Sequence, residues 1–330
     1  MSEKPVDVLA IGNAIVDVIA DSDDAFLAAN GLAKGGMQLI DAAEAERLYA
    51  AMGPGRELSG GSAANTVAGL AALGLKAAFI GQLGDDELGA IFSHDIRALG
   101  VGFDTPPKSD AGPTARCLIL VTPDAQRTMS TFLGAAQHLD SSAVGEARIA
   151  SSKILYLEGY LWDPSEPRSA FESAIRMARD NETKVAFTLS DGFVVERHRG
   201  DFVRLIDEGK IDILFANEAE FLHLTQATDL SSALDAFAGK VPTLVVTRGE
   251  HGALACRGDE RVEVAAEPIE RLVDTTGAGD LFAAGFLAGE ARDRGLEDSL
   301  RLGAIAASEV IQHYGARPEL DLVALAGPLL

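Results

Sequence analysis

The stretch DTTGAGD, residues 274–280, sets consecutive small residues directly before an apolar run that is typical of a helix. Small side chains let backbone N–H groups approach a charged oxygen, and the first turn of a helix adds unpaired donors and the positive end of its dipole. We therefore expect a phosphate-binding anion hole built from the amides of Gly277, Ala278 and Gly279. Asp280, at the rim, would take a proton from an attacking hydroxyl. The alternative is a glycine-rich loop with Asp280 as the N-cap of the helix.

A second glycine-led stretch, SGGSAANTVAGLAALG, occupies residues 59–74. Its two glycines precede an alanine-rich helix, and Gly61, Ser62 and Asn65 lie where that helix would begin. An amide side chain offers both a donor and an acceptor, so Asn65 could bind a diol. The alternative is a core helix that follows a Gly-Gly turn.

Five motifs, taken in order, resemble the signatures of the ribokinase-like, or PfkB, carbohydrate and nucleoside kinase family. They are AIGNAIVD at 10–17, GGSAAN at 60–65, ANEAE at 216–220, VTRGEHG at 246–252 and DTTGAGD at 274–280. The resemblance spans nearly the whole chain. Within the family it is greatest to the adenosine kinases, through Gly12-Asn13, the GGMQLI segment at 35–40 and the GGSxxN form of the second motif. Ribokinases usually carry a lysine where this chain has Ser62.

The resemblance implies a ribokinase-like α/β fold in three layers, with a mainly parallel central sheet flanked by helices and a small β-sheet lid. Strand-like and helix-like runs alternate along the chain, which by itself predicts a parallel sheet covered on both faces. We expect a large domain from 1–13, 41–111 and 134–330, with a lid from 14–40 and 112–133. The expected strands are 6–11, 77–81, 117–121, 153–157, 184–189, 211–215 and 243–247, and the expected helices are 43–52, 62–73, 86–98, 168–180, 218–225, 280–292 and 297–313.

The activity that the resemblance implies is transfer of the γ-phosphoryl group of ATP to the 5′-hydroxyl of adenosine or a related nucleoside, assisted by Mg²⁺. A sugar kinase of the same family, acting on ribose, fructose or a keto-deoxy sugar acid, is the alternative. A non-catalytic nucleoside or sugar sensor is a third hypothesis. The chain has no G-x-x-x-x-G-K-[ST] sequence and no G-x-G-x-x-G sequence, because position 282 is Phe282, which argues against a P-loop enzyme and a dinucleotide-binding dehydrogenase.

On the donor side, Asn217 and Glu220 match the N-x-x-E motif of the family, in which the carboxylate orients Mg²⁺ largely through water. A helix N-cap with a capping-box glutamate explains the same spacing. The other residues implied to contact ATP are Thr247, Arg248, Gly249, Gly252, Thr276 and His313, with Arg127 in the lid. A plain strand-to-turn connection would account for residues 247–252 equally well. The resemblance also admits K⁺ around Asp274 and Thr276.

On the acceptor side, Asp17 is placed like the family aspartate that binds two ribose hydroxyls; the alternative is that it lies on the solvent face of a strand. The other residues implied to bind substrate are Asn13, Gln38, Gly61, Ser62, Asn65, Leu133, Tyr160 and Leu161. A purine base needs a flat or apolar face, for which Phe193 is a further candidate. Tyr160 and Leu161 stand where adenosine kinases tend to carry consecutive phenylalanines, and Thr188 stands where an asparagine is common.

Composition favours an ordinary cytoplasmic enzyme. The net charge of −22 argues against nucleic acid or an anionic membrane as a partner, because both attract clustered Lys and Arg. Cys117 and Cys256 stand far apart and the six histidines form no metal-spaced pair, so we expect neither a disulfide framework nor a zinc site. No signal peptide or membrane-spanning apolar run is visible. The expected partners are therefore ATP and a small-molecule nucleoside or sugar, and a monomer and a homodimer both stay open.

Overall fold

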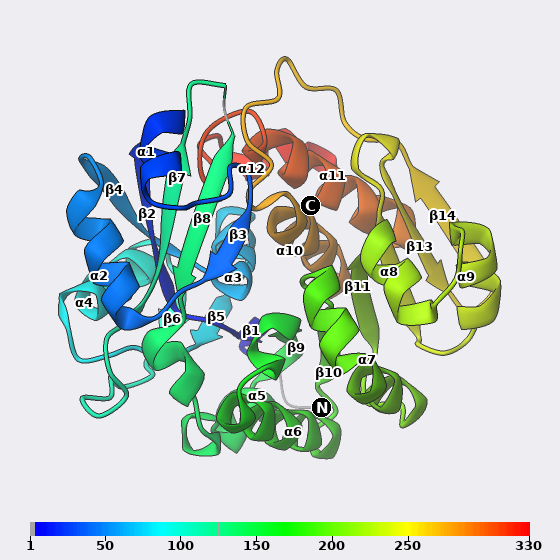
Figure 1. Cartoon of the computed structure of the whole chain (residues 1–330). Coiled ribbons are helices and arrows are strands. Elements are labelled where there is room, and N and C mark those ends of the chain that lie inside the picture. Colours follow the sequence, from blue (N-terminus) through cyan, green and yellow to red (C-terminus); the bar gives the residue numbers. More distant parts are fainter. Residues whose placement is uncertain (1–3, 125) are drawn as a thin grey trace.

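A nine-stranded sheet organises the larger part of the chain, as the computed structural model shows (Figure 1). The strand order is β14-β13-β12-β11-β10-β9-β1-β5-β6. The structure describes residues 4–124 and 126–330. Residues 1–3 of the expected large domain and Ala125 of the expected lid therefore lie outside the described residues. The strands are β1 (Val6–Ile11), β5 (Ala77–Ile80), β6 (Gly102–Phe103), β9 (Ser152–Glu158), β10 (Lys184–Thr188), β11 (Ile213–Asn217), β12 (Thr243–Thr247), β13 (Ala253–Arg257) and β14 (Glu260–Val264).

The seven neighbouring strands β12, β11, β10, β9, β1, β5 and β6 pair in parallel, which confirms the mainly parallel central sheet. The hairpin of β13 and β14 extends one edge with antiparallel pairing and was not predicted. Helices pack on both faces and are α3 (Ser62–Ala72), α4 (Glu87–Ala98), α5 (Glu146–Ala150), α6 (Ser165–Asp180), α7 (Gly192–Asp207), α8 (Glu218–Thr225), α9 (Leu230–Phe237), α10 (Ala278–Ala291), α11 (Leu296–Val310) and α12 (Leu322–Ala326). Throughout 4–124 and 126–330, no helix combines the length and apolar character needed to cross a membrane.

Of these helices, α7 and α9 and the short α5 and α12 were missing from the sequence-based expectation. In α7 the charged run ERHRGD, residues 196–201, interrupts the apolar spacing, and the backbone at His198 leaves helical geometry at φ −119° and ψ 16°. A helical period cannot be recognised across such a kink, because the apolar face changes direction there.

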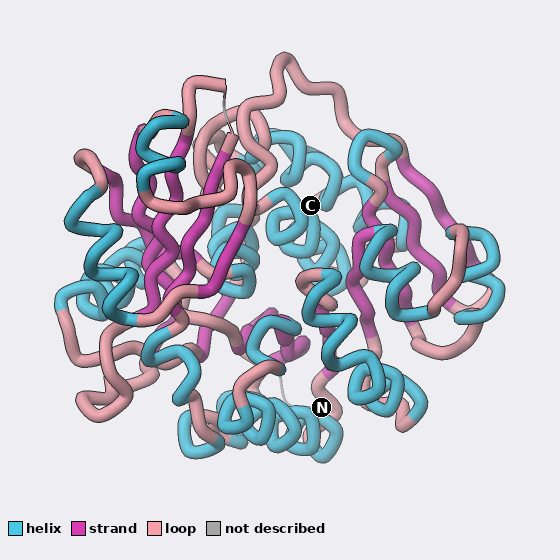
Figure 2. The backbone as a smooth tube through the Cα atoms, viewed as in Figure 1, coloured by secondary structure: helices cyan, strands magenta, loops and turns pink. Residues whose placement is uncertain are grey.

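Successive residues of the central strands enter two separate cores, because side chains alternate between the faces of a strand. In β1, Val8 and Ala10 pack in the core beneath α3, α10 and α11, whereas Leu9 and Ile11 pack on the opposite face with α6, α7, α8 and α9. The tube view shows helices on both sides of the sheet (Figure 2). This double burial explains why the central strands read as continuous apolar runs rather than as alternating ones.

A five-stranded sheet in the order β3-β8-β7-β2-β4 stands at one end of the large sheet, on the left in Figure 1. Its strands are β2 (Ile15–Asp21), β3 (Met37–Leu39), β4 (Gly55–Gly60), β7 (Ala115–Val121) and β8 (Arg127–Phe132), accompanied by α1 (Asp24–Ala29) and α2 (Ala42–Ala51). Strand β4 lies inside the segment 41–111 that we expected in the large domain, yet it pairs with β2. Gly60 reads as a turn residue in the sequence but ends β4, where a Cβ would lie 2.2 Å from a carboxylate oxygen of Asp17. The division into large domain and lid otherwise stays a prediction.

Glycines bring the backbones of α10 and α11 into direct contact. A Cβ added to Gly285 would lie 2.2 Å from the carbonyl oxygen of Leu302, and one added to Gly69 of α3 would lie 2.6 Å from Leu281. The position of α10 relative to α3 and α11 therefore depends on missing side chains. Since α10 begins immediately after the DTTGAGD stretch, this packing also sets the place of that stretch.

Gly285→Ala is expected to lower the free energy of unfolding by about 1–3 kcal/mol, because its methyl group meets the α11 backbone rather than a movable side chain. Gly200→Ala is the matched control, because Gly200 lies in α7 with no atom within 4 Å of the added Cβ. Without a clash, Ala should stabilise that helix by about 0.5–1 kcal/mol. Urea denaturation of both variants checks this, and equal stability of the two would contradict the close packing of α10 and α11.

Candidate functional site

A cavity of about 650 Å³ opens between the small sheet and the carboxyl ends of the parallel strands. Residues at or just after five of these strand ends line it: Asn13 after β1, Glu158 on β9, Thr188 on β10, Asn217 on β11 and Thr247 on β12. Open parallel sheets bind ligands at this edge, because loops and helix starts converge there. The volume suits a small organic molecule together with part of a second one.

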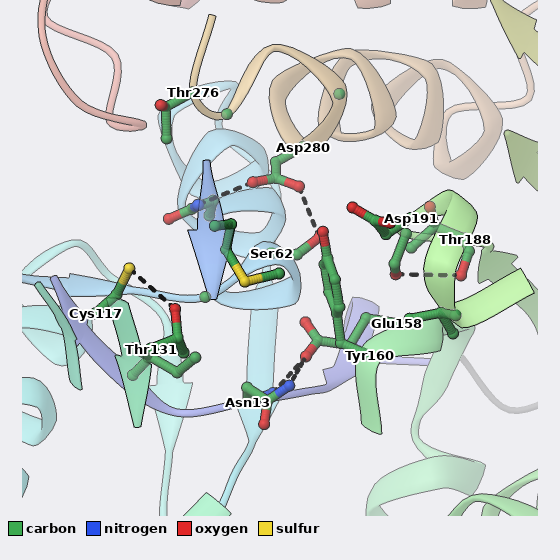
Figure 3. A pocket seen from close by; sticks show the side chains of 18 of the residues that line it. Asn13, Ser62, Cys117, Thr131, Glu158, Tyr160, Thr188, Asp191, Thr276 and Asp280 are labelled. Atoms are coloured by element: carbon green, nitrogen blue, oxygen red, sulfur yellow. Dashed lines mark hydrogen bonds between the residues drawn. The ribbon is translucent and has the colours of Figure 1, made fainter. Parts of the chain in front are cut away.

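The Asp280 carboxylate is held between two side chains of the α3 amino terminus. Ser62 Oγ donates to Oδ1 over 2.7 Å, and Asn65 Nδ2 donates to Oδ2 over 2.8 Å (Figure 3). The N-cap of α10 is Gly277, so the alternative hypothesis of Asp280 as the N-cap is wrong. Burial raises the pKa of Asp280, while the two hydrogen bonds and the nearby Arg317 guanidinium oppose that rise.

Glycines with positive φ begin both helices that meet at Asp280. Gly61 has φ +98° and Gly277 has φ +79°, a region that side-chain-bearing residues rarely adopt. Their missing side chains also matter, because a Cβ would lie 2.2 Å from the Asn13 carbonyl oxygen at Gly61 and 2.5 Å from Ala316 Cβ at Gly277. No side chain caps either helix. The first turn of each is therefore suited to donate N–H groups to a bound anion or oxygen.

Glu158 is a functional residue that the sequence reasoning missed. Its side chain is fully buried, and it accepts hydrogen bonds from Asn13 N and Asn13 Nδ2 on one oxygen and from Ala63 N on the other, each over 2.7 Å. Burial raises its pKa to about 7. The carboxylate thereby ties the loop after β1 to the start of α3. A charged residue at the carboxyl end of the apolar strand ILYL, residues 154–157, was the signal that could have identified it.

Three side chains that can accept hydrogen bonds line the part of the cavity where we expect the hydroxyl-bearing substrate. Among the described residues, Asn13 Oδ1 and Asn65 Oδ1 are buried and have no hydrogen-bond donor, while the amide nitrogens of both side chains donate to Glu158 and Asp280 and so fix the amide orientation. Asp17, on β2, adds a half-buried carboxylate that lines the same cavity, so it does not form a solvent face. Burial and the Asp280 charge raise the pKa of Asp17 to about 7 against the opposing effect of Arg317 and Arg127. Buried acceptors without partners are costly unless a ligand supplies donors.

The small sheet contributes an apolar wall next to these acceptors. Ile15, Cys117, Ile119, Met129 and Leu133 line the cavity from that side. Cys117 is buried, which raises the pKa of its thiol to about 12, so it belongs to the wall as a neutral group. An apolar wall of this kind is suited to the face of a flat ring.

The residues expected around a base divide between the cavity and the core. Tyr160, Gln38 and the exposed ring of Phe193 line the cavity, and Gln38 Nε2 donates to Ser130 Oγ over 3.4 Å. Leu161, in contrast, is buried in the core beside α6 and α7 and does not line it. Of these two consecutive residues in the short helical turn after β9, only Tyr160 therefore contributes to the lining of the cavity.

On the other side of the cavity, Asn217 and Glu220 form a complete capping box, which confirms the structural alternative for this motif. Asn217 N and Nδ2 donate to the Glu220 carboxylate over 3.0 and 2.7 Å. Glu220 nevertheless lines the cavity, and its burial raises its pKa to about 7. Carboxylate and amide oxygens are ligands that Mg²⁺ prefers, and the unused lone pairs of Glu220 fit contact through water.

The remaining expected donor-side residues are divided in the same way. Thr247, Thr276, Gly277 and Gly279 line the cavity. Arg248, Gly249, Gly252, Ala278 and His313 are not among its lining residues. Arg248 forms an ion pair of 3.1 Å with Glu263, and His313 Nε2 lies 3.1 Å from Glu309 Oε1. Most of the residues expected to bind the phosphoryl acceptor therefore line the cavity, whereas several of those expected to contact ATP do not.

The residues around Asp274 do not fit a monovalent cation. Its carboxylate accepts from Thr276 N over 3.0 Å and from Gly315 N over 2.9 Å, and it forms an ion pair with Arg127 of the small sheet. Arg127 Nη1 also donates to Thr276 Oγ1 over 3.2 Å. A guanidinium thus already neutralises the carboxylate that K⁺ would need. In the described part of the chain, no cluster of three or more His, Cys, Asp or Glu residues is placed to hold a metal ion.

The cavity is strongly acidic. Its lining holds six carboxylates, from Asp17, Glu158, Asp163, Asp191, Glu220 and Asp280. Among the described lining residues Arg197 is the one arginine or lysine, and its guanidinium donates to both carboxylate oxygens of Asp163. An anionic ligand therefore needs local compensation from helix amino termini or a bound cation.

Comparison with known proteins supports a common origin with sugar and nucleoside kinases. The family model "pfkB family carbohydrate kinase" matches residues 7–321. A solved structure of a probable sugar kinase from Rhizobium etli CFN 42 is 48% identical, with TM-score 0.92 over 98% of both chains. An adenosine kinase structure from Sinorhizobium meliloti is 49% identical, with TM-score 0.91 over 98% of both chains. A cytidine kinase from Thermococcus kodakarensis is 31% identical, covering 78% of this chain and 89% of its own.

Glu158→Ala is expected to lower the unfolding free energy by about 1–3 kcal/mol, the cost of leaving buried N–H donors without an acceptor, and to raise the KM of the phosphoryl acceptor at least tenfold, because Asn13 loses its anchor. Glu290→Ala is the matched control, since Glu290 is also a buried glutamate but pairs with Arg257 away from the cavity. It should lose stability without a change in KM. Chemical denaturation and steady-state kinetics measure both, and an unchanged KM in Glu158→Ala would refute the positioning role.

Proposed function

Because the chain belongs to the pfkB family of carbohydrate kinases, we propose that it transfers the γ-phosphoryl group of ATP to the 5′-hydroxyl of adenosine or a related nucleoside. Enzymes of this family are phosphotransferases that act on hydroxyl groups. Membership in it therefore argues against a non-catalytic sensor. The observation that carries the nucleoside assignment is the juxtaposition of unpartnered oxygen acceptors with an apolar wall.

The acceptor groups suit the hydroxyls of a ribose. Asp17 can accept from two vicinal hydroxyls at once, and Asn13 Oδ1 and Asn65 Oδ1 add two further acceptors whose orientation is held by Glu158 and Asp280. Asn65 also donates a hydrogen bond to the Asp280 carboxylate. The substrate hydroxyl that donates a hydrogen bond to Asp280 would therefore be the one that is phosphorylated. A site built to accept hydroxyl donors discriminates strongly against an analogue that lacks one, because its buried acceptors are then left unpaired.

The remainder of the acceptor site suits an uncharged, flat group better than a carboxylate. Ile15, Ile119 and Leu133 offer apolar contact, and Gln38 at the edge offers an amide that can hydrogen-bond with the edge of a base. A keto-deoxy sugar acid would place its carboxylate among six acidic side chains, while Arg197 is already paired with Asp163. A neutral sugar remains compatible with the acceptors, but it would leave the apolar wall without a partner.

Asp280 would act as the general base in this reaction. Its raised pKa brings it nearer to neutrality than that of a free aspartate, and Ser62 and Asn65 hold its carboxylate in one orientation. The amides of Gly277 and Gly279 at the start of α10 would stabilise the charge on the transferred group, whereas Ala278 N already donates to the Thr275 carbonyl over 3.2 Å and Ala278 does not line the cavity. Positioning and electrostatic stabilisation account for most of the rate gain in phosphoryl transfer.

Mg²⁺, which kinases of this family generally use with ATP, would neutralise phosphate charge when bound. Glu220 and Asn217 are the residues whose oxygens fit it, with Thr247 and Thr276 nearby on the cavity wall. Their role matters because the cavity supplies little positive charge of its own. Asp274 is not assigned to K⁺, because Arg127 already neutralises its carboxylate.

The similar proteins are consistent with this reading and define its alternative. The Sinorhizobium meliloti structure is named an adenosine kinase and the Thermococcus kodakarensis protein a cytidine kinase, which supports a nucleoside acceptor. The Rhizobium etli structure is named a probable sugar kinase at nearly the same identity. Only the acceptor itself distinguishes these activities, because the carboxylate base and the anion hole serve all of them.

Asp280→Asn is expected to reduce kcat by roughly 10² to 10⁴, because the amide cannot take the proton of the acceptor hydroxyl. The KM for ATP should change little, since Asp280 contacts the acceptor side. Asp229→Asn, which replaces the exposed N-cap of α9 by another good cap, is the control and should keep full activity. Coupled measurement of ADP release checks both variants, and a turnover in Asp280→Asn within threefold of wild type would exclude the residue as the base.

The acceptor is tested by comparing adenosine, inosine, guanosine, cytidine, ribose and fructose at equal concentrations with Mg·ATP. We expect adenosine to exceed the free sugars by at least about tenfold in kcat/KM, equivalent to about 1.4 kcal/mol of transition-state discrimination. The 2′-deoxy and 3′-deoxy analogues of adenosine should have a lower kcat/KM than adenosine itself, because each leaves a hydrogen-bond acceptor of Asp17, Asn13 or Asn65 unpaired. A free sugar that is turned over faster than every nucleoside would overturn the proposal in favour of a sugar kinase.

A further inference from the structure

A second, small cavity lies behind the acceptor site. Asp17 and Asn65 line both cavities, and the second is completed by Ser59, Arg127 and Arg317 among others. Arg127 is already paired with Asp274. Arg317, from the segment between α11 and α12, therefore brings a second positive charge to the rear of the acceptor carboxylates.

Arg317 binds the backbone on both sides of the turn that enters α3. Its Nη1 donates to the Ala64 carbonyl over 2.9 Å, and its Nη2 donates to the Ser59 carbonyl over 2.6 Å and to Ser59 Oγ over 2.9 Å. Gly61, Ser62 and the Gly60 that makes room for Asp17 lie between these contacts. The guanidinium thus clamps the segment that presents the Asp280 partners Ser62 and Asn65.

Asp95 supports this clamp from α4. Its Oδ2 accepts from Ser59 N over 2.9 Å and from Ser59 Oγ over 2.5 Å. Ser59 is therefore held between an acidic side chain and a basic one, while its carbonyl oxygen is bound by the guanidinium. A planar guanidinium with donors in fixed directions suits such a multiple contact, which a single ammonium could not reproduce.

The charges around Arg317 come from several elements. Asp17 on β2, Asp95 on α4 and Asp280 on α10 act on it with favourable sign, and Arg127 on β8 and Glu158 on β9 complete the charged groups near the two site carboxylates. Asp17 and Asp280 disfavour each other's ionisation, and the Arg317 charge lowers the pKa of both against burial. A guanidinium keeps its charge in proteins, so this compensation is permanent.

We propose that Arg317 is a positioning residue for the phosphoryl transfer, one that clamps the β4–α3 turn and supplies the positive charge behind Asp17 and Asp280. The inference rests on the proposed function for the role of these two carboxylates. It assigns to a segment near the carboxyl terminus, outside the motifs of the sequence, a direct influence on the acceptor site. Arg317 does not line the main cavity, so its effect passes through Asp17, Ser62, Asn65 and Asp280.

The kinetic test compares Arg317→Met and Arg317→Lys with wild type across pH 5.5–9.5, using whichever acceptor the wild type phosphorylates. Activity falls with decreasing pH as the carboxylates take up protons, and without the guanidinium this acid limb of kcat/KM should move up by about one pH unit in Arg317→Met. Well below the wild-type midpoint that shift alone gives about a tenfold loss, which rising pH recovers. Arg317→Lys should keep the wild-type limb but lose activity equally at every pH, because charge remains while the clamp is lost.

Arg292→Met is the matched control. Arg292 is a partly buried arginine that donates to the Leu73 carbonyl at the carboxyl end of α3, whereas Arg317 contacts the amino-terminal end of that helix. It should leave the limb and kcat/KM unchanged. An Arg317→Met limb with the wild-type midpoint would overturn the proposal, since a purely structural role lowers activity without shifting a titration.

Thermal unfolding tests the charge without any acceptor, so it distinguishes failure of this inference from failure of the proposed function. A carboxyl with a raised pKa keeps its proton in the folded state while the unfolded chain has lost it, so stability falls as pH rises until the folded group also ionises. In Arg317→Met that fall should continue to higher pH, and its Tm deficit against wild type should widen between about pH 6 and 9. The Arg292→Met deficit should stay constant, because its neighbour Asp7 has a lowered pKa. A constant deficit in Arg317→Met would likewise refute the proposal.

Discussion

The contact between Asp280 and the start of α3 is the interaction on which the site depends. It joins residues 62 and 65 to residue 280 and brings two uncapped helix amino termini to one point. A side chain at Gly61 would collide with the Asn13 carbonyl, and one at Gly277 would collide with Ala316, so both helix starts depend on glycine. The close packing of α10 on α3 and α11 through Gly69 and Gly285 supports the same geometry from the core. Backbone proximity, made by missing side chains, therefore precedes the chemistry.

A cost of this arrangement is the accumulation of negative charge. Glu158 and Glu220 are buried and Asp17 and Asp280 are partly buried, and burial raises the pKa of all four. Hydrogen bonds from amides offset part of that cost at Glu158 and Glu220, because backbone N–H groups and asparagine side chains stabilise the ionised form. At Asp17 the compensation comes from the Arg317 and Arg127 guanidinium groups, and at Asp280 it comes from the hydrogen bonds of Ser62 and Asn65 together with the Arg317 charge.

The small sheet takes part in both halves of the site. Its inner surface supplies the apolar wall and Asp17, while Arg127 at the start of β8 joins the sheet to the loop that holds the anion hole, through Asp274 and Thr276. Any movement of this sheet relative to the large one would therefore alter the acceptor contacts and the loop before α10 together. Such coupling fits a reaction in which water must be kept away from the transferred group.

The fold class, the family and most of the central strands could be predicted from the sequence, as could the cavity residues Asn13, Ser62, Asn65 and Asp280, because these follow local signals such as a strand end or a glycine-led helix start. Asp17 lies inside a strand and was predicted through the family resemblance. The sequence could not place Leu161 in the core rather than in the cavity, or β4 in the small sheet, since both depend on which face of a chain segment meets a neighbour. The contacts of Glu158 and Arg317 became visible in the folded chain alone. Their partners lie 95 or more residues away, and no local pattern encodes a contact between such distant segments.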